Sequence, residues 1–91
     1  MSMQIQHDPA ARRFTATVEG HEAELTYELQ SGCMAITHTG VPTAIAGKGV
    51  AGALVRTALE HARAEGLKVA LVCSYAATYV QRHPQYADLL A

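Results

Sequence analysis

The sequence VPTAIAGKGVAGAL, residues 41–54, decides how the rest of the chain folds. Its glycines, Gly47, Gly49 and Gly52, let the backbone turn tightly and approach a ligand closely, because glycine has no Cβ. The first N–H groups of the helix that follows have no partner inside the helix and lie at the positive end of its dipole. The stretch therefore predicts a strand, a glycine loop and a helix start that together seat a phosphate or pyrophosphate, with Lys48 as a mobile positive charge. The alternative is a tight connection without a ligand, since short glycine patterns are common.

Before this loop, apolar and polar side chains alternate in four short runs, which predict strands at residues 3–7, 13–18, 22–30 and 33–39. The third run is the clearest: Ala23, Leu25, Tyr27 and Leu29 share one face, whereas Glu22, Glu24, Thr26, Glu28 and Gln30 share the other. Short turns join the runs, and Ser31-Gly32 is a hairpin signal. We therefore expect a four-stranded antiparallel meander with one face in water.

After the loop the apolar spacing changes to that of a one-sided helix over residues 49–65. The apolar positions are Ala51, Leu54, Val55, Ala58, Leu59 and Ala62. Arg56, Glu60 and Arg63 lie on the opposite side at spacings that permit weak ion pairs, and Gly66 ends the helix.

Residues 68–73, KVALVC, are apolar without alternation, which predicts a strand that is covered on both faces and central in the sheet. A right-handed crossover would place this strand parallel to residues 33–39. Ser74 is positioned to cap a helix that runs to about Arg82, and Pro84 opens a last short helical piece. The predicted fold class is thus α/β (α+β): an antiparallel four-strand meander, a helix, a parallel fifth strand and C-terminal helices.

Composition narrows the functional classes. With 91 residues, 49% of them hydrophobic and 16% charged, the chain fits a single domain spanning residues 1–91. A net charge of −1 and the lack of a basic run argue against nucleic-acid binding, and no apolar run is long enough for a membrane span. The two cysteines show no metal spacing, and the N-terminus lacks the pattern of a signal peptide. We therefore expect a cytoplasmic protein without a metal.

Ligands of such sheets bind where neighbouring strands diverge at their carboxyl ends. Here those ends are residues 39–41 and Cys73, and the glycine loop begins directly after residues 39–41. The loop, the helix start and the strand ends therefore point to one crevice.

Three segments, HTGVP (38–42), AGKGVAGAL (46–54) and CSYAATYVQRHPQYADLL (73–90), resemble the small, single-domain branch of the GCN5-related N-acetyltransferases. The resemblance covers roughly residues 22 to 90 and implies acetyl-CoA as co-substrate. It implies that backbone amides of the loop hold the pyrophosphate and that the strand edge near Val41 pairs with the pantetheine arm. The residues expected to bind the cofactor are Val41, Ala46, Gly47, Lys48, Gly49, Val50, Ala51, Gly52 and Tyr75.

This sequence departs from the family pattern at two positions. Ala46 stands where the family usually has Gln or Arg, and Gly40 stands where the small branch typically carries Glu as a general base. Larger relatives often carry a Tyr general acid on the helix after the fifth strand; alignment places Gln81 there, with Tyr79 half a turn away.

Three residues are candidates for catalysis. Cys73 is the last residue of the predicted fifth strand and lies beside a helix N-terminus that would lower its pKa, so it is a candidate nucleophile or part of the thioester pocket. His38 ends the fourth strand and is a candidate base, because the imidazole pKa lies near neutrality. Tyr79 is the candidate acid. Each has a structural alternative: a small core residue, a strand histidine and a packed aromatic ring.

The preferred function is an acetyl-CoA-binding protein that transfers acetyl to an unidentified amine, as a monomer or weak homodimer. Glu22, Glu24 and Glu28 form an acidic stripe that would attract a cationic amine or would simply be a solvated strand face. The alternatives are a CoA-binding or sensing module without turnover and a small interaction domain whose glycine loop is only a connector.

Overall fold

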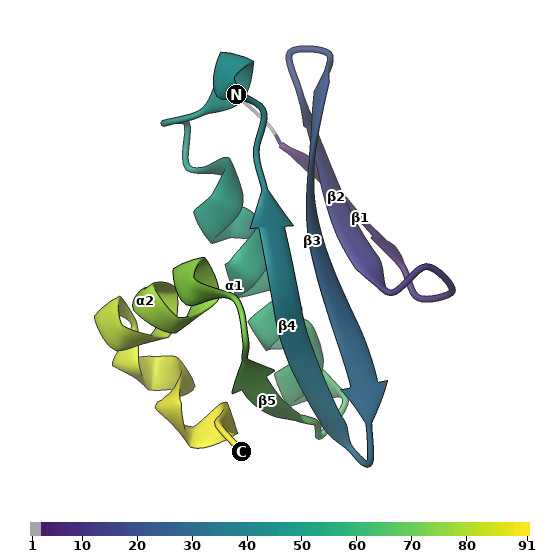
Figure 1. Cartoon of the computed structure of the whole chain (residues 1–91), viewed down its shortest axis with the longest axis vertical. Helices are drawn as coiled ribbons and strands as arrows, with labels where there is room; N and C mark the ends of the chain where they lie inside the picture. The colour runs from purple at the N-terminus through teal and green to yellow at the C-terminus, as the bar shows by residue number, and fades with distance from the viewer. Residues whose placement is uncertain (1–2) are drawn as a thin grey trace.

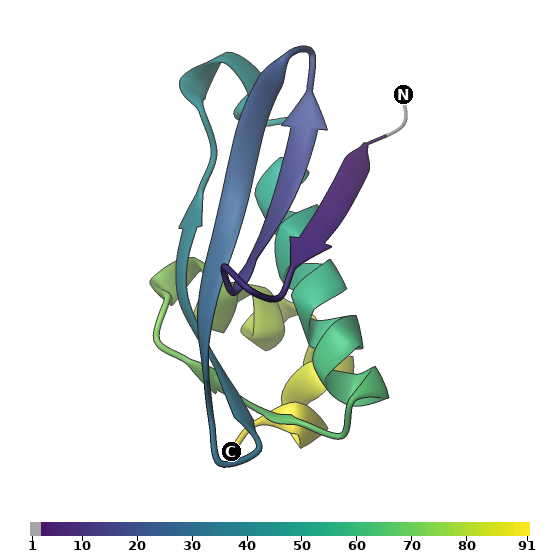
Figure 2. The same cartoon turned by 90° about the vertical axis from the view of Figure 1, so that its right-hand side faces the viewer.

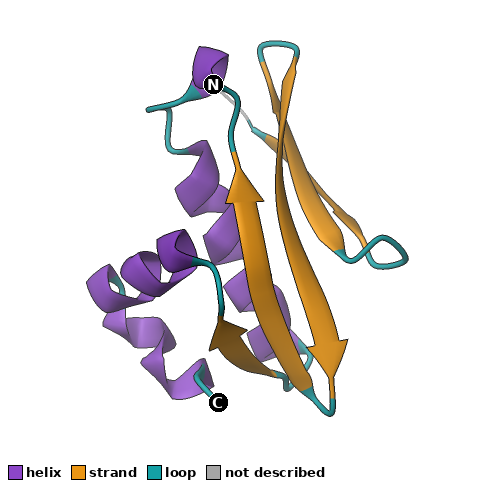
Figure 3. Ribbon diagram, in the orientation of Figure 1, coloured by secondary structure: helices purple, strands orange, loops and turns teal. Residues whose placement is uncertain are grey.

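The computed structural model describes residues 3–91, which form one five-stranded sheet with helices packed against it (Figure 1). The sheet order is β1-β2-β3-β4-β5. The strands are β1 (Gln4–Asp8), β2 (Arg13–Val18), β3 (His21–Gln30), β4 (Cys33–Gly40) and β5 (Lys68–Leu71). The α-helices are α1 (Val50–Ala64) and α2 (Ser74–Arg82), and the 3₁₀ helices are η1 (Thr43–Ile45) and η2 (Pro84–Leu89) (Figure 3).

The antiparallel meander and the parallel crossover are both confirmed. β1 to β4 pair in antiparallel order, and β4 pairs with β5 in parallel after α1. The β3–β4 hairpin turns at Ser31 and Gly32, which have φ angles of 51° and 76°. Two consecutive positive φ angles are typical of the tight turns that match the twist of a hairpin.

The core lies between one face of the sheet and α1, which runs along that face (Figure 2). Phe14, Leu25 and Ile36 from the sheet and Leu54 and Leu59 from α1 are each no more than 2% exposed. The apolar stripe predicted for α1 is buried as expected, except that Ala51 is only half-buried and Val50 is buried instead. α2 and η2 pack beside α1, next to β5 (Figure 1).

The prediction for the fifth strand is wrong in two respects. β5 ends at Leu71, and it lies at the edge of the sheet and not at its centre. Within β5, Lys68 is exposed and only Val69 is fully buried, and Val72 beyond the strand is 67% exposed. A short apolar run without alternation cannot distinguish a covered strand from an edge strand that turns away.

Leu29 is opposite the buried Met34 and therefore lies on the predicted face of β3, although it is 45% exposed close to the β3–β4 hairpin. One smaller prediction fails. Ser74 is already inside α2, so that Cys73 occupies the N-cap position and no side chain makes a cap hydrogen bond.

Candidate functional site

β4 and β5 separate close to the middle of β4. Their pairing runs from Cys33 to Ile36 on β4, and the N–H groups of Val72 and Cys73 both donate to the Ile36 carbonyl, at 3.1 and 2.9 Å. Beyond that point the chain leaves for α2, while β4 continues to Gly40 (Figure 1). In the part of the chain that the structure describes, the edge of β4 after Ile36 therefore faces no strand on the β5 side.

A β-bulge lies at the same place. Tyr27 is opposite Ile36 but Thr26 is opposite His38, so Thr37 is an extra residue in β4. The Thr37 hydroxyl donates to the Thr26 carbonyl at 3.2 Å. Bulges redirect the side chains that follow them. Because Thr39 is opposite the buried Leu25, its side chain lies on the helix-covered face, whereas His38 lies on the other face.

The glycine loop leads directly into α1. Gly47 and Gly49 have φ angles of 79° and 78°, and Gly49 is the N-cap of the helix. No side chain caps this end, and no acidic residue lies in its first turn. The amides of the first turn therefore keep their hydrogen-bonding capacity at the positive end of the dipole, which suits an anion.

An open cavity of about 340 Å³ adjoins this helix start. It is lined by Val41, Ala46, Gly47, Gly49, Val50, Ala51 and Tyr75. These are seven of the nine residues that the sequence predicts to hold the cofactor. The segment directly after β4, the glycine loop, α1 and α2 each contribute to it, so the cavity exists only in the folded chain.

The other two predicted cofactor residues, Lys48 and Gly52, do not line the cavity. Lys48 Nζ is 3.3 Å from Glu19 Oε2 in the β2–β3 turn, and Lys48 does not line the cavity. Gly52 is inside α1, where a Cβ would lie 3.4 Å from the Tyr75 hydroxyl and 3.5 Å from Cε2 of Tyr79. The side chains of Tyr75 and Tyr79 in α2 therefore pack against α1 at Gly52.

Cys73 lies where β4 and β5 separate. Its Sγ is 3.6 Å from Oγ1 of Thr39, and the residue is half-buried. Burial alone would raise the pKa of the thiol, but the amides of Ala76 and Tyr75 at the start of α2, with the Thr39 hydroxyl and amide, outweigh it and lower the pKa. This is the direction that the sequence predicts for a thiol at a helix N-terminus.

The other two catalytic candidates are not brought together with Cys73. His38 is exposed on the opposite face of β4, with its Nε2 close to Gly40: a Cβ at position 40 would lie 2.9 Å away. Tyr79 stacks on His83 with ring centroids 4.0 Å apart, and burial raises the pKa of its hydroxyl. Tyr79 is absent from the residues that line the cavity.

Two residues that contact the site were not identified from the sequence. Alternation from the buried Met34 and Ile36 places Thr39 outward, and the extra residue in β4 turns its side chain inward. Glu19 could not be found either, since it lies 29 positions before Lys48 in a turn with no distinguishing pattern.

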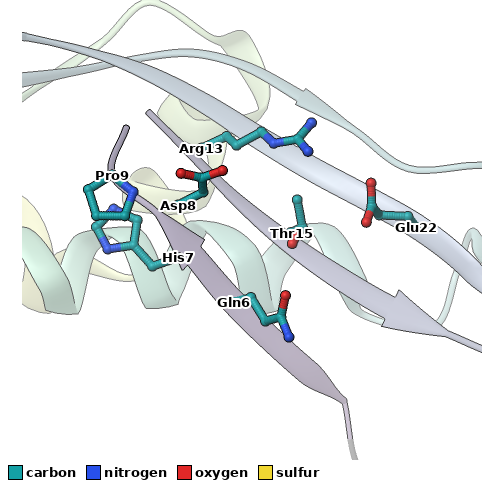
Figure 4. A pocket seen from close by; sticks show the side chains of 7 residues that line it. All are labelled: Gln6, His7, Asp8, Pro9, Arg13, Thr15 and Glu22. Atoms are coloured by element: carbon teal, nitrogen blue, oxygen red, sulfur yellow. The ribbon is translucent and has the colours of Figure 1, made fainter. Parts of the chain in front are cut away.

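A second open cavity lies at the far side of the sheet, around β1, β2 and the start of β3 (Figure 4). It is polar and includes Asp8, Arg13 and Glu22. On the same face Arg13 Nη1 donates to Glu24 Oε1 at 3.3 Å, and Arg12 pairs with Glu28 at 3.1 Å. The predicted acidic stripe is therefore partly neutralised by neighbouring guanidinium groups.

Residues 3–91 contain neither a metal site nor a membrane-spanning helix. No group of three or more His, Cys, Asp or Glu side chains is arranged to hold a metal ion in this part of the chain. Among the same residues, no helix combines the length and apolar character that a membrane-crossing helix needs.

Comparison with known proteins agrees with this geometry. The family model described as GCN5-related N-acetyl-transferase matches residues 13–89. The chain is 38% identical to Protein NATD1 of Gallus gallus over 93 residues, covering 97% of this chain and 84% of that protein. It is 37% identical to Protein NATD1 of Homo sapiens, with coverages of 97% and 82%.

A solved structure extends the comparison to three dimensions. The NMR structure of a GCN5-like protein from Staphylococcus aureus superposes with a TM-score of 0.76 at 28% identity, and it covers 97% of this chain and 87% of that one. Fold and sequence therefore lead to the same assignment. The chain belongs to the GCN5-related N-acetyltransferase family.

Proposed function

We propose that this protein binds acetyl-CoA in the cavity beside the α1 N-terminus and transfers its acetyl group to an amine. The observation that carries the proposal is the cavity itself, in which Gly47, Gly49 and the first turn of α1 meet Val41 and Tyr75. Backbone amides at a helix start bind phosphate groups without needing a charged side chain. Val41, which lines the cavity, directly follows β4, whose edge is free after Ile36.

In this arrangement the pyrophosphate lies on the amides of the loop and of α1. The pantetheine arm lies along the free edge of β4, where its amide groups take the place of a neighbouring strand. The thioester then reaches the point where Cys73 and Thr39 face each other. The acceptor nitrogen attacks the thioester carbonyl carbon, the C–N bond forms as the C–S bond breaks, and the nitrogen loses a proton while the CoA thiolate gains one.

Cys73 is the side chain we assign to this chemistry. Its lowered pKa favours the thiolate, which is the reactive form of cysteine. In the two-step version, the Cys73 thiolate attacks the thioester carbonyl carbon, the C–S bond to CoA breaks and CoA leaves as a thiolate. The amine then attacks the acetyl group on the cysteine sulfur, the Cys73 thiolate is released, and the proton that the amine loses passes to the CoA thiolate. His38 and Tyr79 remain candidates for the proton transfers.

One observation favours a second function, which is CoA binding without turnover. His38, Tyr79 and Cys73 lie on different faces or elements and do not form a cluster of acid and base. A sensing module needs the cavity alone. The two functions share every prediction about binding and differ only in acetyl transfer.

A pair of matched glycine variants tests binding. Gly49→Val and Gly66→Val introduce the same branched side chain at positive φ, 78° and 70°, with no neighbour within 4 Å of the new Cβ at either position. Of these two glycines, Gly49 lines the cavity and Gly66 does not. Titration of acetyl-CoA followed by amide NMR should show Gly49→Val binding at least about tenfold more weakly than the wild type, which corresponds to about 1.4 kcal/mol. Gly66→Val should bind normally, and equal losses in both variants would contradict the assigned cavity.

Cys73→Ala tests turnover separately from binding. The alanine removes the sulfur at a half-buried position and leaves the loop amides in place, so acetyl-CoA binding should be unchanged. Release of free CoA with a panel of primary amines should fall by at least about a hundredfold if the thiolate is the nucleophile. Full activity in Cys73→Ala would rule out the two-step version, and no activity in the wild type with any amine would leave CoA binding as the function.

A further inference from the structure

The cofactor cavity contains no charged side chain among the residues that the structure describes. Its seven lining residues are four glycines or alanines, two valines and one tyrosine. CoA, in contrast, carries a pyrophosphate and a separate 3′-phosphate on its ribose. The loop amides can serve the pyrophosphate, but the cavity offers no cationic side chain for a second phosphate group.

The one cation in the glycine loop is held away from the cavity. Lys48 lies between two cavity residues, Gly47 and Gly49, yet its Nζ is 3.3 Å from the Glu19 carboxylate. Glu19 is in the β2–β3 turn and has a φ angle of 51°, followed by Gly20 at 77°. The tight turn places the Glu19 carboxylate where the Lys48 side chain reaches it.

Both partners of this pair are partly exposed, at 37% for the Lys48 side chain and 50% for that of Glu19. Exposed ion pairs are weak, and a lysine side chain is flexible, so loss of Glu19 would free Lys48 to turn toward a bound phosphate.

We propose that Glu19 is a specificity-determining residue: by holding Lys48, it keeps the cavity free of side-chain charge, so that the site binds the pantetheine and pyrophosphate of a CoA ester and does not select for the 3′-phosphate. The ligand class is thus any pantetheine pyrophosphate, including 3′-dephospho-CoA. This inference rests on the proposed function, since it assumes that the cavity binds CoA.

The test is a set of titrations with CoA and 3′-dephospho-CoA, monitored by calorimetry at low salt. In the wild type the two dissociation constants should agree within about twofold, because the extra phosphate meets no cation. Glu19→Gln should bind CoA about two- to fivefold more tightly and 3′-dephospho-CoA with a smaller gain, since the freed lysine meets the additional charge. The gain should disappear at high salt.

Two further variants assign the effect to the pair. Lys48→Met alone should leave both affinities within about twofold of the wild type, and the double variant with Glu19→Gln should show no gain. Glu28→Gln is the matched control, because Glu28 also belongs to an exposed ion pair, with Arg12 at 3.1 Å, and the substitution changes the net charge equally. It should not alter CoA binding.

Three outcomes would overturn the proposal. One is a preference of about tenfold or more for CoA over 3′-dephospho-CoA in the wild type. Another is a loss of CoA affinity of about tenfold or more in Lys48→Met, which would show that the lysine contacts the bound ligand. The third is an equal gain in Glu28→Gln, which would show a general effect of net charge. Failure of the wild type to bind either compound would instead overturn the proposed function, and with it this inference.

Discussion

The two ends of α1 differ in how they satisfy the polar groups around them. At the N-terminal end, Gly49 caps the helix without a side chain, and the adjoining cavity is lined by apolar residues and backbone. At the C-terminal end, the side chains of Glu60 and Arg63 of α1 are hydrogen-bonded to η2. The Tyr86 hydroxyl donates to Glu60 at 2.7 Å, and Arg63 donates to both carboxylate oxygens of Asp88, at 2.9 and 3.1 Å.

The difference separates a binding end from a structural end. Arg63 also donates to the Gln85 carbonyl at 2.9 Å, and Lys68 donates to the Asp88 carbonyl at 3.1 Å, so η2 is held at several points. Ion pairs predicted within α1 from the spacing of Glu60 and Arg63 are therefore replaced by contacts with η2. A ligand can be taken up only at the end where hydrogen-bonding groups are still without protein partners.

Removal of Tyr86 should have the largest effect on this contrast. The side chain is 3% exposed, and its truncation in Tyr86→Ala should lower the free energy of unfolding by about 3–5 kcal/mol. Tyr86→Phe, which loses only the hydrogen bond to Glu60, should lose about 1–2 kcal/mol. Urea unfolding measures both.

CoA binding is the second measurement on these variants. If the two ends are independent, the folded fraction of Tyr86→Ala should bind CoA with wild-type affinity. A parallel loss of affinity in Tyr86→Phe would show that the C-terminal contacts position the cavity, and the comparison between the two ends would fail.

A smaller effect, of opposite sign, is expected from Gly52→Ala at the binding end. The new Cβ would be 3.4 Å from the Tyr75 hydroxyl and 3.5 Å from the Tyr79 ring, which are ordinary contact distances. Alanine in place of a helical glycine stabilises a protein by about 0.5–1 kcal/mol, so thermal unfolding should shift upward. A bulkier Gly52→Leu would meet both rings, and its melting temperature should fall below that of the wild type.

The weakest effect concerns pH at the β1 side of α1. His7 is half-buried, with its Nε2 hydrogen-bonded to the Tyr27 hydroxyl at 2.6 Å and its ring stacked on Phe14 at 4.1 Å. The ring of His61 in α1 contacts the His7 ring, with 4.5 Å between the ring centroids. Burial, and then the neighbouring His61, lower the pKa of His7 below its ordinary value of 6.5, with Asp8 opposing.

The sign of the pH effect follows from this lowered pKa. Well above pH 6.5 His7 is neutral in both the folded and the unfolded state, so it adds no pH dependence there. As the pH falls below that value, the unfolded chain takes up the proton first, and the free energy of unfolding should decrease. His7→Phe should flatten this part of the stability curve, whereas His21→Gln, at an exposed position, should leave it unchanged. An unchanged curve in His7→Phe would contradict the assignment.

The order of the elements and the membership of the cavity could be read from the sequence because both depend on neighbours in the chain. Alternation gave β2 with its observed bounds, and β3 within one residue. The glycine loop places Ala46, Gly47, Gly49, Val50 and Ala51 around one cavity because these residues are close together in the chain. The predicted roles of Cys73, His38 and Tyr79 in catalysis stay predictions.

The tertiary structure decided what depends on partners distant in sequence. A lysine side chain reaches as far as its stem allows, so whether Lys48 faces the cavity or Glu19 is set by where the β2–β3 turn lies. One extra residue in β4 moves each side chain that follows it to the opposite face of the sheet, so that His38 and Cys73 lie apart. No local sequence pattern indicates this extra residue. The sequence by itself thus determined the elements, their order and the loop that can bind an anion, since local geometry and hydrophobic periodicity act within short segments. Only the folded chain decided which charges remain near that loop, because this depends on contacts across the sheet.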